Sequence, residues 1–117
     1  MINMERIRTR FLRDPIPIRL AGLAADLARI SSSARRTIGA AQVGEMIEES
    51  RYFIEWTAGE IPVDQAAELV DIQVMLTIWK HAWPEAQASQ AQRTLLSLQA
   101  KKWSDQVLEY SGLTADT

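Results

Sequence analysis

The chain has 117 residues and a formal net charge of −2, with 47% hydrophobic and 24% charged residues, which is typical of one globular domain. It contains no cysteine, which excludes disulfides, zinc–thiolate sites and a thiol nucleophile, and which fits the cytoplasmic location that we expect. No apolar run approaches the ~20 residues of a membrane span, and no apolar segment of a secretory signal follows the first charged residues.

The charge is unevenly distributed along the chain. Residues 1–36 carry eight arginines against three acidic side chains, a formal charge of +5. Residues 37–117 carry five basic and twelve acidic side chains, a formal charge of −7. Such a split indicates either a nucleic-acid-binding arm or a basic segment that lies against an acidic one, in the same fold or in a neighbour.

We expect residues 1–16 to form a basic N-terminal arm. Met4, Ile7 and Phe11 recur at helical spacing within it. Prolines 15 and 17 then break the helical pattern, because each one fixes its own φ and disfavours helix in the residue before it. The arm is the candidate contact for nucleic-acid phosphates, through Arg6, Arg8, Arg10 and Arg13.

Two amphipathic helices are predicted next, over residues 17–36 and 40–59. In the second, Tyr52 and Trp56 lie opposite the apolar stripe, among glutamates. We expect another segment to pack on this aromatic pair, because the helix alone would leave both side chains in water. The arm is one candidate cover, with Ile7 and Phe11 meeting the aromatics and arginines meeting the glutamates.

The predicted helix over residues 63–82 is apolar on two nearly opposite sides. The first seam contains Val63, Ala67, Val70, Val74 and Thr77, with Ala66 and Ile78 beside it. The second seam contains Leu69, Ile72, Leu76, Trp79 and Trp83. A surface helix shows one apolar stripe, so a helix with two is expected to be covered on both sides. The second seam is a dimer interface, an arm-covered surface or part of the core.

Trp83-Pro84 predicts a turn, followed by a helix over about 85–111. Ser89 and Gln92 offer an alternative start for that helix as a capping box, and Gly112 is its expected C-terminal cap. Four helices with short connections predict an all-α antiparallel up-and-down four-helix bundle over residues 17–112. Residues 113–117 are expected to be a C-terminal tail.

Two segments, Leu23–Ser32 (LAADLARISS) and Lys102–Leu113 (KWSDQVLEYSGL), are similar to segments of a family of small all-helical cyanobacterial proteins of unknown function. Glu55-Trp56-Thr57-Ala58 fits the same pattern. The resemblance covers a minor part of the chain. It implies a helical bundle and no particular activity.

No constellation of residues indicates catalysis, a metal, a cofactor or a small-molecule ligand. His81 is the single histidine, and position 78, where a di-iron bundle would need glutamate, is isoleucine. The glutamates lie off the apolar stripes, and the five glycines form no phosphate loop.

The sequence therefore predicts a non-catalytic helical interaction or regulatory module. We expect it to form a homodimer, or to bind another helical protein, through an apolar-aromatic helix face. The predicted interface residues are Tyr52, Trp56, Leu69, Ile72, Leu76, Trp79 and Trp83. The alternative is a nucleic-acid-associated protein that binds through the arginine arm, and no membrane partner is expected.

Overall fold

The computed structural model describes residues 3–113 and is all-helical, with no strand in that range, which confirms the all-α part of the predicted fold class. The five α-helices in this range are α1 (Met4–Leu12), α2 (Ile16–Ala34), α3 (Val43–Thr57), α4 (Val63–Ala86) and α5 (Gln90–Ser111). A turn of 3-10 helix precedes α3 at Ala40–Gln42, and another follows it at Ala58–Glu60.

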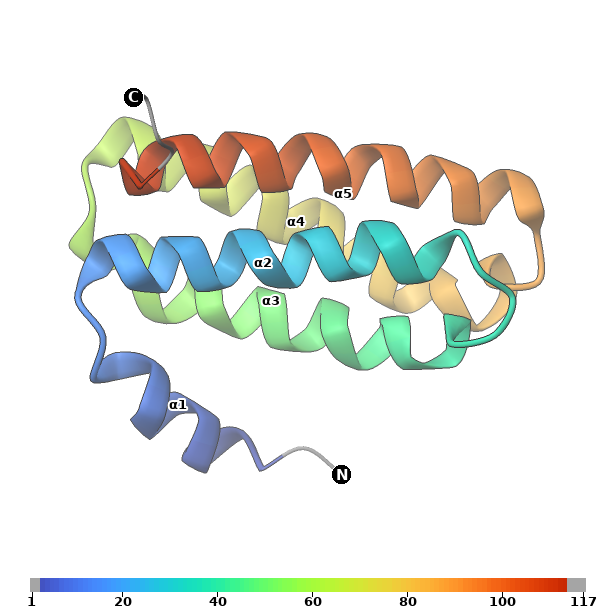
Figure 1. The fold of residues 1–117 in the computed structure, drawn as a ribbon, viewed down its shortest axis with the longest axis horizontal. Coiled ribbons are helices and arrows are strands. Elements are labelled where there is room, and N and C mark those ends of the chain that lie inside the picture. Colours follow the sequence, from blue (N-terminus) through green and yellow to red (C-terminus); the bar gives the residue numbers. More distant parts are fainter. Residues whose placement is uncertain (1–2, 114–117) are drawn as a thin grey trace.

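The four long helices lie side by side, and each runs opposite to the one before it (Figure 1). Helix α2 packs most extensively on α5 and also on α3, whereas α4 packs on α3 and more loosely on α5. Helix α1 lies outside this group and contacts α3. The described chain measures 37 × 34 × 23 Å along its principal axes.

The predicted boundary between α4 and α5 is wrong by one turn. Helix α4 continues through Pro84 to Ala86, because a proline in the last turn removes only one helical hydrogen bond and both Trp83 and Ala86 are buried. The next helix starts at its alternative position, where the Ser89 hydroxyl accepts the Gln92 backbone N–H at 3.2 Å. Gly112 ends α5 with a φ of +70°, as predicted.

The N-terminal arm is a helix that packs on the aromatic residues of α3. The Asn3 side chain caps it by accepting the Arg6 backbone N–H at 3.1 Å. Phe11 is buried and stacks on Phe53 with ring centroids 4.1 Å apart, and its ring lies 5.8 Å from that of Trp56. The arm therefore covers this part of α3 by apolar contact. Between residues 3 and 113, no arginine of α1 forms an ion pair with a carboxylate, so the predicted arginine–glutamate contacts are not formed.

A buried arginine holds the turn between α1 and α2 in place. The Arg19 guanidinium donates to the carbonyls of Asp14 (2.8 Å) and Leu12 (3.3 Å), and to the Glu60 carboxylate (3.0 Å). Glu60 lies in the turn before α4, so one side chain joins two connections that are distant in sequence. Hydrogen bonds from a charged donor are among the stronger ones in proteins.

We expect Arg19→Ala to loosen the arm and to lower the free energy of unfolding by about 1–2 kcal/mol, because two carbonyls lose their charged donor. Trypsin should then cleave faster after Arg8, Arg10 and Arg13. Arg36→Ala is the matched control, since Arg36 is exposed and its side chain makes no hydrogen bond with residues 3–113. Equal cleavage rates in the two variants would contradict this role for Arg19.

Small polar side chains let α2 and α5 approach closely. The Ser31 and Ser97 hydroxyls donate to each other's backbone carbonyls at 2.8 and 2.7 Å. About two helical turns further along α5, the Ser104 hydroxyl donates to the Ala24 carbonyl at 2.7 Å. All three serines are buried, and the reciprocal bonds satisfy them without a longer side chain between the helices.

Candidate interaction surface

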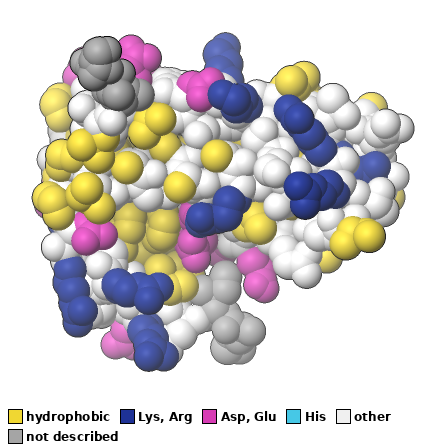
Figure 2. Space-filling view, in the orientation of Figure 1, with side chains coloured by type: hydrophobic (Ala, Val, Ile, Leu, Met, Phe, Trp, Pro, Cys, Tyr) yellow, Lys and Arg dark blue, Asp and Glu magenta, His cyan; other side chains and the backbone are white. Residues whose placement is uncertain are grey.

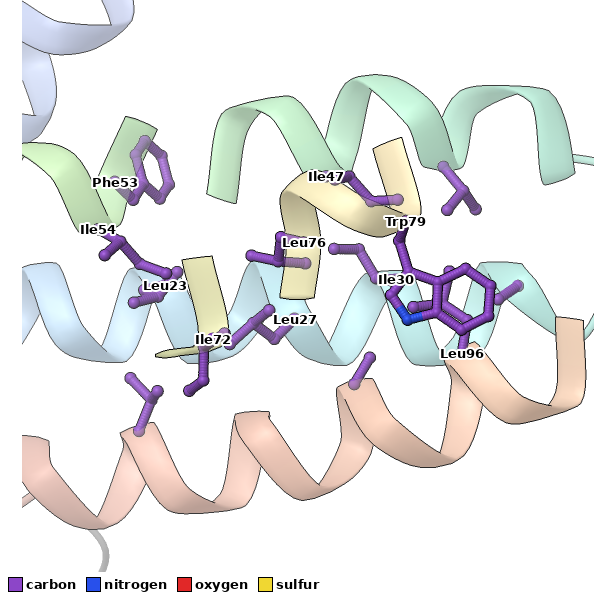
Figure 3. Close-up of a cluster of buried hydrophobic side chains, with 14 of the residues drawn as sticks. Leu23, Leu27, Ile30, Ile47, Phe53, Ile54, Ile72, Leu76, Trp79 and Leu96 are labelled. Carbon is purple, nitrogen blue, oxygen red and sulfur yellow. The ribbon is translucent and has the colours of Figure 1, made fainter. Parts of the chain in front are cut away.

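The second seam of α4 is part of the core. Its five residues, which the sequence offered as a dimer interface, are at most 5% exposed in the single chain. In Figure 3, Ile72, Leu76 and Trp79 point among side chains of the neighbouring helices. The interface prediction is therefore wrong for Leu69, Ile72, Leu76, Trp79 and Trp83.

The sizes of the side chains explain which seam is buried. An aromatic side chain buries about 150–250 Å², at about 25 cal/mol per Å², and the second seam contains two tryptophans. The first seam contains three valines, an alanine and a threonine, with another alanine and an isoleucine beside it, and their burial would remove less apolar area from water. The polar atoms of the indoles are also satisfied inside: Trp79 donates to Gln99 at 2.8 Å, and Trp83 to the Ala40 carbonyl at 2.7 Å.

The aromatic pair on α3 belongs largely to the contact with the arm. Trp56 is half-buried beside Phe11 and Phe53, so only part of its side chain is accessible to another molecule. Tyr52 lies at the edge of this cluster, with its ring 5.6 Å from that of Trp56, and stays 37% exposed. Tyr52 is the most exposed of the seven predicted interface residues.

The first seam of α4 forms an exposed apolar stripe. We define the outer face of α4 as Val63, Ala67, Val70, Val74 and Ile78, which recur every three or four residues and so lie on one side of the helix. The four larger side chains are exposed by 85%, 42%, 54% and 55% in chain order. At 1.5 Å per residue, the stripe is about 23 Å long. Sequence reasoning found this seam but expected it to be covered by the fold.

The two edges of the outer face differ in charge. On the edge towards α3, charges of both signs are present: Arg51 binds Glu48 at 2.6 Å and donates to Thr77 at 2.9 Å, Lys80 lies 4.0 Å from Glu48, and the exposed Glu55 accepts a hydrogen bond from Gln73 at 3.1 Å. On the edge towards α5 stand Asp64, Glu68 and Asp71, all exposed. Within residues 3–113, none of these three carboxylates forms an ion pair. This acidic edge is thus the strongly charged border of the apolar stripe.

A groove of about 360 Å³ lies between α4 and α5, next to the acidic edge. Its lining includes Ile72, Met75 and Trp103, with Glu68, Asp71 and Lys102 as the charged groups. Glu68 accepts hydrogen bonds from Gln106, at 2.6 Å, and from the Tyr110 hydroxyl. Burial, together with the Glu68 carboxylate, raises the pKa of Tyr110 above the ordinary tyrosine value, and the protonated hydroxyl is the donor to Glu68.

The arginines of α1 are exposed, as nucleic-acid contacts would require. Figure 2 shows Lys and Arg side chains gathered over α1, which lies outside the group of four long helices in Figure 1. Arg6, Arg10 and Arg13 line one surface hollow together with Thr9, whereas Arg8 does not. Whether these side chains contact nucleic acid stays a prediction.

His81 is exposed, and no group of three His, Cys, Asp or Glu side chains in residues 3–113 is arranged to hold a metal ion. None of the helices described is long and apolar enough to cross a membrane.

Comparison of the chain with protein-family models, with curated proteins and with solved structures finds no significant match.

Proposed function

We propose that this protein is a non-catalytic helical interaction module that binds a helix of a partner protein along the outer face of α4. The observation that carries this proposal is the exposure of Val63, Val70, Val74 and Ile78 in one stripe. A helix with one side in the core needs no second apolar side for folding. Spacings of three and four residues match the ridges and grooves with which helices pack.

The arrangement of the helices supports a rigid docking surface. We interpret α2 to α5 as the up-and-down four-helix bundle that the sequence predicts, with α1 as its arm, because each long helix packs on the next and α5 returns to α2. Within this bundle, α4 is held by Leu69, Leu76 and Trp83 on its inner side. A partner helix would therefore meet a preformed stripe, which lowers the entropic cost of binding.

A photo-crosslinking amino acid at position 74 tests the proposal in the protein's own host. We expect benzoylphenylalanine at Val74 to form a discrete protein adduct on illumination. The matched control places it at Leu98 on α5, which is exposed to a similar extent (60% against 54%) but lies outside the outer face of α4. An adduct with the mass of two copies would identify the partner as a second copy. No adduct at 74, or equal adducts at 74 and 98, would overturn the proposal.

Association with nucleic acid through α1 is the second candidate function, favoured by the exposed arginines that lack a carboxylate partner within residues 3–113. It predicts binding of a labelled oligonucleotide that weakens steeply with salt. Binding should disappear when Arg6, Arg10 and Arg13 are replaced by alanine. Binding that survives this replacement would exclude the arm as the contact.

A further inference from the structure

We infer that the partner helix carries lysine or arginine along one flank, and that one of these cationic side chains enters the groove between α4 and α5. The inference rests on the proposed function and adds the chemistry of the partner. It follows from the different charges at the two edges of the outer face and from the composition of the groove.

The acidic edge selects the sign of the partner's charge. Asp64 and Asp71 are exposed and form no ion pair within residues 3–113, whereas Lys80 and Arg51 on the other edge both face Glu48. A partner helix that covers the valines must bring one flank beside these carboxylates. An acidic flank would be repelled there, and a basic flank would be attracted. Charges at the rim of an interface act mainly on the choice of partner and on the association rate, and less on the affinity.

The groove suits a long cationic side chain. Met75 and Trp103 supply apolar and aromatic surface for the methylene stem, and Asp71 supplies a carboxylate for the charged end. Glu68 is held at the same groove by Gln106 and Tyr110, so its carboxylate is positioned before binding. Lys102 is the one cation among the lining residues, against two carboxylates.

The same charges argue against a second copy as the occupant. Consider two α4 helices that pack antiparallel and are related by a two-fold axis. This symmetry places equivalent edges of the two copies on the same side of the interface. The acidic edge of one copy would then lie beside the acidic edge of the other, with Asp71 close to the middle of the stripe. In a parallel pair, the acidic edge of one copy would meet the edge towards α3 of the other copy. There Arg51 and Lys80 already face Glu48. A basic helix from another protein avoids both arrangements.

Two stapled synthetic helices of about 18 residues provide the test. They share one leucine–alanine seam and differ in one flank, which is lysine in the first peptide and glutamate in the second. Fluorescence anisotropy with the full chain should show at least about tenfold tighter binding of the lysine peptide at about 50 mM salt. The difference should shrink at about 500 mM salt, where exposed charges are screened.

Charge reversal assigns the effect to the acidic edge. Asp64→Lys with Asp71→Lys should remove or reverse the preference for the lysine peptide. The control, Glu5→Lys with Glu45→Lys, makes the same change in net charge at exposed positions on α1 and α3 and should keep the preference. Val74→Glu should abolish binding of both peptides, because it places a charge in the apolar stripe.

The outcomes separate the two proposals. Equal binding of the two peptides, or a preference that survives reversal of Asp64 and Asp71, would overturn the basic-flank inference. Binding of neither peptide would overturn it as well. If an adduct still forms at Val74 in these cases, helix binding on the outer face stands and only the chemistry of the partner is wrong. Lysine-peptide binding that survives Val74→Glu would place the contact elsewhere and count against the inference.

Discussion

Replacing Leu76 with glutamate should unfold the protein, whereas the same replacement at Val74, two residues away, should leave it folded. Leu76 is completely buried, and Val74 is 54% exposed. Removing a buried leucine side chain alone costs about 2–5 kcal/mol, and a carboxylate without a partner in the core costs more. The free energy of unfolding of a domain is only about 5–15 kcal/mol, so the cost of Leu76→Glu is expected to equal or exceed most of it.

Urea denaturation followed by circular dichroism measures this contrast. Val74→Glu should keep the unfolding midpoint within a small shift of the parent, and Leu76→Glu should show no cooperative transition. Ile72→Glu and Trp79→Glu should behave like Leu76→Glu, because both side chains are buried as well. A folded Leu76→Glu variant would show that the second seam lies at a surface.

Trp83→Ala should lower the free energy of unfolding by about 3–5 kcal/mol, the usual range for removing a large buried aromatic side chain. Trp83 is 3% exposed, and its indole N–H donates to the Ala40 carbonyl at 2.7 Å. It also lies beside Gly44, where an added Cβ would be 3.8 Å from the indole Cδ1. The indole thus joins the end of α4 to the start of α3.

Trp83→Phe separates the hydrogen bond from the packing. Phenylalanine keeps most of the apolar volume but removes the indole donor, at a cost of about 0.5–1.5 kcal/mol, because the Ala40 carbonyl still accepts the Val43 backbone N–H. We expect its unfolding midpoint to fall between those of the parent and of Trp83→Ala. Equal midpoints for the two variants would mean that the hydrogen bond, and not the cavity, accounts for the loss.

Local signals in the sequence predicted the helical elements well. Gly112 ends α5 because a left-handed residue is needed there, and Ser89 begins α5 because its hydroxyl caps the first turn. Both effects act within a few residues, so they can be inferred without knowing what surrounds the helix. The contact of Phe11 with the aromatic cluster of α3 was also predictable, since Trp56 needed a cover and the arm was apolar at helical spacing.

The sequence by itself determined that α4 has two apolar sides, and the tertiary structure decided which of them is buried. Periodicity records the angle between Leu76 and Val74 on the helix, but not which side meets α2, α3 and α5. That choice depends on the total area buried and on donors such as the Trp83 indole finding acceptors in distant segments. The continuation of α4 through Pro84 has the same origin, because burial of Trp83 and Ala86 outweighs a local helix-breaking signal. Local chemistry thus determined the elements, while the competition between surfaces for burial decided which apolar side of α4 stayed exposed.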